Sequence, residues 1–478
     1  MTFDPAVKRS LIEILGPVHV RDDPVTLYAY RVDGLTLHPA EAMGVVFPGN
    51  KDDLCAVVRL FHENKISFLP RGAGTGLSGG AIPSQGSVII EMVRFNTIQK
   101  VDELNRTITV GPGVVNIHIS QAAEPHGLCF VPDPSSQKAC SVGGNVAENS
   151  GGPHTLKYGV TVNHVLGLEI VLPDGRPCRL GGKVWGTPGP DLLGLFIGSE
   201  GTFGIVTSVI CRLTPLPEKV ITLLGIFSSV GDACRTVSET IRAGIVPAAM
   251  ELVDKIVIQA VEQAFGAGFP LDAEAILIIE LEDLAEGLSE EADQIRAICA
   301  RNHAREVRQA RNDAERALIW QARKEAFGAL GALSPSFYTQ DGVIPRGALP
   351  QVLEKVLAIG ARHGLTVANV FHAGDGNLHP LILYDAHDEQ QVAAVQRAGD
   401  EILTVCLEAG GTLSGEHGIG LEKAHLMERV FTQQDLDNMR QVRAVFNPNN
   451  LLNPGKIFAT PGRCGETKMM HAKSGIRV

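Results

Sequence analysis

The stretch from Pro70 to Ala81, PRGAGTGLSGGA, constrains this chain more than any other, because five of its twelve residues are glycine. A backbone without Cβ atoms can turn successive N–H groups toward one anion and so form a phosphate-binding concavity. Three of the glycines satisfy G-x-G-x-x-G, but that dinucleotide fingerprint must open a helix, whereas residues 87–92 (SVIIEM) have the composition of a strand. The stretch therefore predicts a phosphate-binding loop between two strands, with a glycine-rich turn that binds nothing as the alternative.

Length and composition bound the possible classes of protein. The 478 residues suffice for two or three domains, and 44% hydrophobic with 20% charged residues is typical of a globular protein. A formal net charge of −11 without any basic run argues against a nucleic-acid partner. No apolar run reaches the ~18 residues of a membrane span, and the N-terminus lacks the apolar core of a signal peptide. We therefore expect a cytoplasmic protein.

The cysteines are scattered and odd in number, nine in all. No two of them form C-x-x-C, so neither a zinc ribbon nor an iron–sulfur site is indicated. Buried thiols in a reducing compartment are the simplest interpretation.

The first half of the chain predicts a small α/β lobe and two further glycine-rich regions. Expected strands are 45–47, 66–69, 88–92, 106–110 and 166–172, and expected helices are 50–64, capped by Asn50, and 114–126. Residues 131–159 are poor in apolar side chains, and a long ordered loop of this kind is usually functional. The cluster IGSEGTFGIVT (197–207) precedes another strand, and Pro215 and Pro217 then mark a domain boundary.

From Val220 onward, apolar strands alternate with amphipathic helices. Expected strands are 220–227, 275–281, 365–371 and 378–384, and expected helices lie near 231–244, 289–302, 313–330, 348–362 and 389–408. This order predicts an α+β unit in which the helices cover one face of a largely antiparallel sheet.

Six motifs, taken together, carry a resemblance. They are PRGAGTGLSGGA, DPSSQKACSVGGNVAENSGGPHTLKYG, GSEGTFGIVT, HAGDGNLHP, SGEHGIGLEK and NPGKIF, in this order along residues 35–460. With them the chain resembles the FAD-linked oxidoreductases of the vanillyl-alcohol oxidase and p-cresol methylhydroxylase superfamily. Within it, the likeness is greatest to the flavin subunits of bacterial glycolate oxidases, followed by D-lactate and D-2-hydroxyglutarate dehydrogenases.

The resemblance implies an α+β fold with a two-lobed FAD-binding domain and a substrate or cap domain built on a largely antiparallel sheet. The FAD-binding domain would span 1–217, with a helical lead-in over 1–35. The cap domain would span 218–425, and 426–460 would return to the FAD domain. Residues 461–478 would form a tail.

The resemblance also implies which residues hold FAD. The pyrophosphate would lie against Arg71, Gly72, Ala73, Gly74, Thr75, Gly76, Leu77 and Gly79. Further cofactor contacts would come from Pro132, Asp133, Ser135, Ser141, Gly143, Gly144, Asn145 and Gly151. Glu200, Gly201, Gly204 and Ile205 would lie by the adenosine, and Asn453 by the isoalloxazine. Some relatives attach flavin covalently through His or Tyr, for which His154 is a candidate, but we expect non-covalent FAD.

The expected chemistry is oxidation of a small 2-hydroxy acid, glycolate or D-lactate, with hydride transfer to flavin N5. Such a reaction needs a base for the hydroxyl proton, and we assign it to His417, beside Glu416. Arg323 matches a family position that binds the substrate carboxylate with its guanidinium. The plainer alternatives are a solvated His on a loop and an Arg that faces water. Leu381, where hydroxyglutarate enzymes often have Asn, favours a shorter acid.

The motif HAGDGNLHP also suggests a metal site. Asp375-Gly376 is a strong signal for a two-residue hairpin turn, which would set His372 opposite His379 with their Cβ atoms roughly 5 Å apart. With Glu416 as a third ligand, the pair would suit zinc, manganese or iron and leave positions open for substrate. The alternative is two histidines that form hydrogen bonds without a metal.

The sequence also leaves other functions open and raises the question of which acceptor takes the electrons. The alternatives are oxidation of D-2-hydroxyglutarate or another D-2-hydroxy acid, an aryl-alcohol oxidase, a flavin-dependent transferase, and a non-catalytic flavoprotein subunit. The resemblance implies a separate electron acceptor, namely an iron–sulfur subunit with a second flavin-domain-like subunit. The chain would be cytoplasmic, or peripheral to the inner membrane through those partners.

Overall fold

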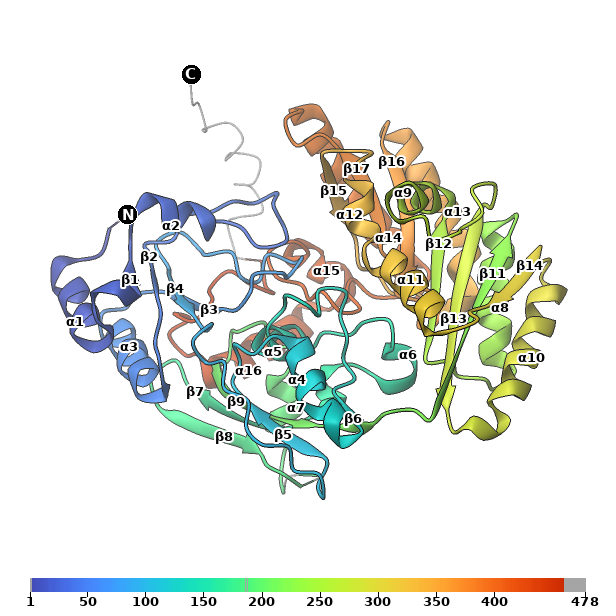
Figure 1. Ribbon diagram of the computed structural model, residues 1–478. Coiled ribbons are helices and arrows are strands. Elements are labelled where there is room, and N and C mark those ends of the chain that lie inside the picture. Colours follow the sequence, from blue (N-terminus) through green and yellow to red (C-terminus); the bar gives the residue numbers. More distant parts are fainter. Residues whose placement is uncertain (1, 185, 187, 460–478) are drawn as a thin grey trace.

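The computed structural model describes residues 2–184, 186 and 188–459, so the predicted tail (461–478) lies outside the described residues. Figure 1 shows two lobes, one in blue to teal and one in green to orange. The C-terminal helices α15 (Met427–Val430) and α16 (Gln433–Phe446), in red, lie back against the first lobe. No helix in the described part of the chain has the length and apolar character needed to cross a membrane.

The first sheet holds the glycine loop. Its order is β1 (Val20–Arg21), β2 (Gly44–Val46), β4 (Val88–Glu91), β3 (Phe68–Arg71), and the last three are parallel. Helices α1 (Pro5–Leu15) and α3 (Lys51–Glu63) pack on it. Asn50 caps α3 as predicted, because its side chain accepts hydrogen bonds from the N–H groups of Asp52 and Asp53 at 2.9 Å. The glycine loop joins β3 to β4, two strands, as the sequence predicts.

The second sheet of this lobe is antiparallel, with the order β5 (Thr107–Val110), β9 (Ile205–Arg212), β7 (Val165–Val171), β8 (Pro177–Gly181). Residues 131–159, expected as a loop, contain helices α5 (Val142–Glu148) and α6 (Thr155–Tyr158). The first helix was not predicted because it contains glycines at 143 and 144, and glycine has the lowest helix propensity after proline. The lobe's remaining elements are α2 (Pro24–Ala29), α4 (Asn116–Ala123), α7 (Leu192–Phe196), β6 (Leu128–Cys129), β10 (Thr214–Pro215) and the 3₁₀ helices 17–19, 124–126 and 161–164.

The second lobe is built on one seven-stranded antiparallel sheet. Its order is β14 (Glu306–Gln309), β11 (Lys219–Phe227), β13 (Ala275–Asp283), β12 (Ala249–Asp254), β16 (Thr366–His372), β17 (Pro380–Tyr384), β15 (Ser336–Thr339). The largely antiparallel character agrees with the prediction.

Helices cover both faces of this sheet, so the expectation of a single covered face was wrong (Figure 1). One face carries α8 (Val230–Arg242), α10 (Ala285–Arg301), α13 (Leu349–Arg362) and α14 (Glu389–Glu408). The other carries α9 (Lys255–Phe265), α11 (Asp313–Lys324) and α12 (Ala326–Leu330). The sequences of two strands do indicate that both faces are covered. β11 and β13 are apolar at consecutive positions rather than alternate ones, as strands buried on both faces are. Two 3₁₀ helices, 346–348 and 424–426, complete the fold.

Candidate active site

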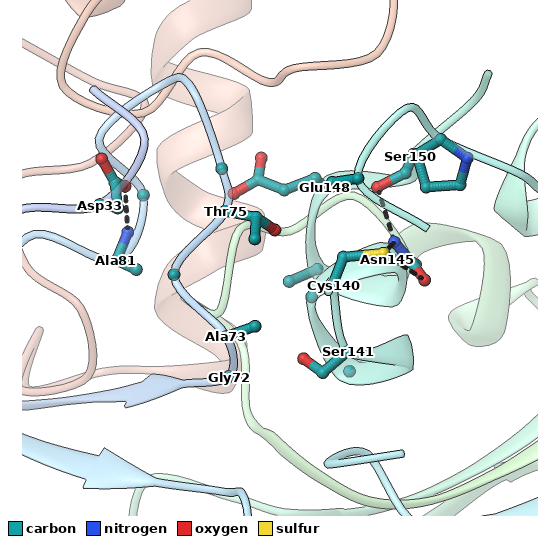
Figure 2. A pocket seen from close by; sticks show the side chains of 18 of the residues that line it. Asp33, Gly72, Ala73, Thr75, Ala81, Cys140, Ser141, Asn145, Glu148 and Ser150 are labelled. Atoms are coloured by element: carbon teal, nitrogen blue, oxygen red, sulfur yellow. Dashed lines mark hydrogen bonds between the residues drawn. The ribbon is translucent and has the colours of Figure 1, made fainter. Parts of the chain in front are cut away.

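A cavity of about 440 Å³, within the range of small-molecule sites, is lined by residues of both lobes. Seventeen residues predicted to hold FAD line it: Arg71, Gly72, Ala73, Gly74, Thr75, Gly76, Leu77, Ser135, Ser141, Gly143, Gly144, Asn145, Glu200, Gly201, Gly204, Ile205 and Asn453. Figure 2 shows that the glycine loop and the N-terminal end of α5 face each other across this space. The second lobe adds Phe327, Phe337 and His379.

Four predicted cofactor residues do not line the cavity. They are Gly79, Pro132, Asp133 and Gly151. Gly79 has φ +78 and packs between Leu35 and Leu421, so its glycine character serves the turn. Asp133 points toward the second lobe, where it pairs with Lys324 at 3.1 Å. The motifs therefore identify segments that line the cavity, but not which of their residues face inward.

Arg71 shapes the glycine loop through hydrogen bonds to carbonyl groups. Its guanidinium donates to the carbonyl oxygens of Tyr30, Val32 and Ala81 at 3.3, 2.8 and 3.2 Å. A Cβ atom at Gly74, which has φ +69, would lie only 2.3 Å from Nη2 of Arg71. The glycine is therefore required for the guanidinium to lie beneath the loop, and backbone atoms are left to line the cavity.

Asn453 joins three motifs at the floor of the cavity. Its Nδ2 donates to the carbonyl oxygens of Gly80 and Glu200 at 3.1 and 2.8 Å. Nζ of Lys456 donates to Asn453 Oδ1 at 3.1 Å and to Ile82 O at 2.6 Å. The C-terminal segment thus fixes the glycine loop and the GSEG turn relative to each other.

The hairpin of HAGDGNLHP differs from the predicted one. His372 pairs with Asn377, which leaves a four-residue turn over 373–376 instead of the two-residue turn Asp375-Gly376. The N–H of Asn377 is bound by Oδ1 of Asp375 at 3.1 Å, a local side-chain bond that competes with the tighter turn. His379 therefore lies between the paired positions Asn377 and Pro380 and not opposite His372. Its ring nevertheless meets that of His372, with 5.0 Å between the ring centroids.

His372, His379 and Glu416 converge as predicted for a metal site. The Nε2 atoms of both histidines lie 3.2 Å from Oε1 of Glu416, and three ligand atoms from these residues lie within 4.8 Å of one another. Burial alone would raise the pKa of Glu416, but the charges and hydrogen bonds of the histidines hold it well below its ordinary value. An ionised carboxylate and two imidazole nitrogens are a suitable donor set for a divalent cation.

Arg323 is not where the family position suggests. It does not line the cavity and is 1% exposed. Its Nε and Nη2 lie 2.7 and 2.5 Å from Oε2 of Glu251, whose other oxygen lies 2.7 Å from Nδ1 of His372. Arg323 therefore reaches the candidate site through Glu251. Glu251 was missed because nothing near it in the sequence marks it; only the pairing of β12 with β16 brings it to His372.

His417 lies beside the candidate metal site and lines the cavity. Its ring stacks on that of His379 with 4.9 Å between centroids. Burial lowers the pKa of His417 to about 4, against the opposing charge of Asp341, so the imidazole is neutral at physiological pH.

Asp341, which the sequence interpretation missed, holds the loop that carries His417. Its Oδ2 accepts hydrogen bonds from the N–H groups of Gly415 and His417 at 3.1 and 2.9 Å and from Ser414 Oγ at 2.5 Å. Its Oδ2 lies 3.3 Å from Nζ of Lys423 and 4.0 Å from Nδ1 of His417. A lone aspartate after Gln340 carries no motif, so only the folded contacts reveal it.

His154, the candidate for covalent flavin attachment, lies where the two lobes meet. Its Nδ1 lies 3.0 Å from Asp133 and its Nε2 lies 3.4 Å from Glu280 of the second lobe. The ring stacks on Trp320 with 5.6 Å between centroids and does not line the cavity. His154 therefore links the two lobes.

Comparisons with known proteins agree with this geometry. Residues 42–181 match the family model of an FAD binding domain, and residues 216–457 match that of the C-terminal domain of FAD linked oxidases. The chain is 45% identical over 446 residues to the glycolate oxidase subunit GlcD of Escherichia coli K12, covering 93% of this chain and 89% of that protein. It is 33% identical over 438 residues to D-lactate dehydrogenase of Archaeoglobus fulgidus, covering 90% and 95%.

Solved structures show the same fold at low sequence identity. p-Cresol methylhydroxylase matches with a TM-score of 0.80 at 17% identity, covering 95% of this chain and 96% of that one. The 4-ethylphenol oxidase of Gulosibacter chungangensis matches with 0.78 at 20% identity, covering 96% and 98%. The resemblance and the fold class inferred from the sequence are thereby confirmed. This chain belongs to the family of FAD-linked oxidases.

Proposed function

We propose that this oxidoreductase oxidises a small 2-hydroxy acid, such as glycolate or D-lactate, to the 2-oxo acid. The observation that carries the proposal is the juxtaposition of His417 with His372, His379 and Glu416 beside the cavity that the glycine loop lines. Relatives named glycolate oxidase subunit and D-lactate dehydrogenase support the same substrate class.

FAD suits the residues of the cavity. The glycine loop offers backbone close to an anionic group. Glu148 lines the same cavity, and its Oε2 has no hydrogen-bond partner among the described residues. When bound, FAD would supply the hydride acceptor. Because both ring nitrogens of His154 face carboxylates, we propose that the cofactor is held without a covalent bond to it.

We infer that His372, His379 and Glu416 hold a divalent cation, for which zinc, manganese and iron all accept this donor set. Such an ion would supply a Lewis acid at the substrate's hydroxyl group. Glu251 holds the imidazole of His372 in place, a support that metal-binding histidines commonly have. The alternative is that both histidines donate hydrogen bonds to the substrate without a metal.

The proton chemistry falls to His417. Its neutral imidazole can accept the hydroxyl proton as hydride leaves the α-carbon. The ionised Asp341 then stabilises the imidazolium, because its carboxylate lies 4.0 Å from Nδ1. The same carboxylate holds the loop that carries His417, so orientation and charge stabilisation come from one residue.

The size of the acid is a separate question. Leu381, expected to favour a short substrate, is fully buried in the core between the sheet and helices α9, α11 and α12, and does not line the cavity. The preference for a short acid is supported instead by the names of the relatives. An aromatic alcohol is disfavoured because the site beside the cavity is ionic rather than apolar.

We also propose that electrons leave through partner subunits, an iron–sulfur subunit and a second flavin-domain-like subunit. The support is the similarity to proteins named as subunits. The expected cytoplasmic or inner-membrane-peripheral location stays a prediction.

A substrate panel tests the proposed function. Purified holoprotein is assayed with an artificial electron-accepting dye and D- and L-2-hydroxy acids, with aryl alcohols as comparison. We expect turnover with glycolate or D-lactate and much slower reduction of O₂ than of the dye. Turnover confined to aryl alcohols would refute the substrate class, and rapid peroxide formation would refute the need for a partner.

A further inference from the structure

We propose that Glu148 contacts the bound cofactor as a neutral carboxylic acid, donating a hydrogen bond to one of the flavin's acceptor atoms, while its neighbour Glu200 stays ionised. The proposal deepens the proposed function and rests on its cofactor part alone, not on the substrate or the metal. Glu148 was not among the residues predicted from the sequence to hold FAD.

Glu148 ends helix α5 and lines the cavity. Figure 2 shows its side chain extending from α5 toward the glycine loop, near Thr75. A Cβ atom at Gly80 would lie 2.6 Å from its Oε1, and one at Gly418 would lie 2.1 Å from its Oε2. Both glycines thus leave room for this carboxyl group, where the glycine loop, α5 and the SGEHGIG loop meet.

Glu148 and Glu200 flank the same glycine, Gly418, but have different partners. The oxygens of Glu200 accept hydrogen bonds from the N–H groups of Ile419 and Gly420 at 2.7 and 2.6 Å. Oε2 of Glu148 has no hydrogen-bond partner in the part of the chain that the structure describes. Burial raises the pKa of both carboxyl groups, but the N–H groups of Ile419 and Gly420 lower that of Glu200. Two carboxylates in one site cannot both ionise cheaply, so the proton belongs on Glu148, whose Oε2 has no donor.

The surrounding charges agree with this assignment. Burial raises the pKa of Glu148 well above its ordinary value, and the carboxylates of Glu200 and Asp33 raise it further. The ammonium groups of Lys423 and Lys456 oppose the shift without cancelling it. The surroundings therefore favour the neutral form of Glu148.

A buried O–H group without an acceptor costs about 1–3 kcal/mol, so Glu148 requires one. The cavity that it lines would seat FAD, and Asn453, expected by the isoalloxazine, bonds to the carbonyl oxygen of Gly80, which lies beside Glu148. The ring nitrogens and carbonyl oxygens of a flavin accept hydrogen bonds. A fixed neutral donor also favours the reduced flavin, because the ring gains electron density on reduction. Glu148 would thus raise the reduction potential of the cofactor.

The reduction potential of bound flavin in substrate-free holoprotein tests this directly. Glu148→Gln keeps a neutral donor of the same shape, whereas Glu148→Ala removes it. We expect the Gln variant to match wild type. We expect the Ala variant to lose about tenfold in its preference for reduced over oxidised flavin, a fall of about 30 mV for a two-electron couple. Equal potentials in all three proteins, or equal falls in both variants, would overturn the proposal.

Infrared difference spectra, reduced minus oxidised, give a second readout that needs only wild type and Glu148→Gln. We expect a protonated-carboxyl band that shifts on flavin reduction and is lost in Glu148→Gln. It should survive in the control Asp254→Asn, which removes a buried carboxyl of the second lobe. No such band in wild type, or its survival in Glu148→Gln, would contradict the proposal. Because no substrate is added, a wrong substrate assignment leaves both tests intact.

Discussion

Nδ1 of His372 lies 2.7 Å from Oε1 of Glu251, and both side chains are buried. This contact fixes the orientation of the imidazole so that Nε2 faces Glu416 at 3.2 Å. It also links the candidate metal site to Arg323, which pairs with the other oxygen of Glu251. We propose from these contacts that Arg323 supports Glu251 and does not contact the substrate.

Replacing Glu251 should weaken metal binding. In Glu251→Gln the imidazole of His372 loses its ionic support, and such changes typically cost 10–100-fold in metal affinity, so we expect about this loss. Competition with a chelator measures it on the purified holoprotein. Glu169→Gln, on an exposed carboxylate paired with Lys51, serves as the control. Unchanged affinity in Glu251→Gln would show that the histidines do not hold a metal with this support.

Removing the metal should remove activity. We expect dye-linked oxidation of the best 2-hydroxy acid to stop after chelation and to return when zinc, manganese or iron is added back. The variants His372→Ala and His379→Ala should contain no stoichiometric metal while retaining FAD. Full activity in a metal-free preparation would leave both histidines as hydrogen-bond donors only.

Removing the charge of Arg323 should destabilise the protein more than any surface substitution. Arg323→Met leaves the buried carboxylate of Glu251 without its guanidinium partner, and breaking such a pair costs about 3–5 kcal/mol. Urea unfolding measures this, with Arg311→Met, whose side chain is 84% exposed, as the control. If Arg323 instead bound substrate, the main change would be a raised KM at nearly unchanged stability, which our account excludes.

The link between the lobes at His154 should depend on pH. Burial on its own would lower the pKa of His154, but Asp133 and Glu280 raise it from 6.5 to about 10. A raised pKa means that this contribution to stability is fully present below pH 6.5 and is lost as the pH rises through about 10. We expect the urea midpoint of wild type to fall over this interval more steeply than that of His154→Gln. Parallel slopes would show that folding does not raise the pKa of His154.

Local signals in the sequence were reliable where a residue acts on its own neighbours. Asn50 caps α3 because its side chain reaches N–H groups two and three residues away. The strand-like composition of residues 87–92 likewise placed the glycine loop correctly between two strands. HAGDGNLHP forms a hairpin as predicted, but its register differs, since His372 pairs with Asn377 and Asp375 binds the N–H of Asn377 in a wider turn.

What the sequence could not provide are contacts between distant segments. Glu251 reaches His372 across 121 residues and Asp341 reaches His417 across 76, and neither carboxylate stands in a motif. Glu148 stands inside GGNVAENSGG, yet its role depends on Gly418 and Glu200 from elsewhere in the chain. For Arg323, neither the family position nor the alternative of an Arg that faces water revealed its buried partner, Glu251.

Anaerobic mixing of the purified holoprotein with a 2-hydroxy acid tests the central claim most directly. We expect one equivalent of glycolate or D-lactate to bleach the visible absorbance band of oxidised flavin and to yield one equivalent of the 2-oxo acid. His417→Ala should bind FAD but lose most of the rate of bleaching, because the hydroxyl proton has no acceptor. A flavin that stays oxidised with every small D- and L-2-hydroxy acid would contradict the account.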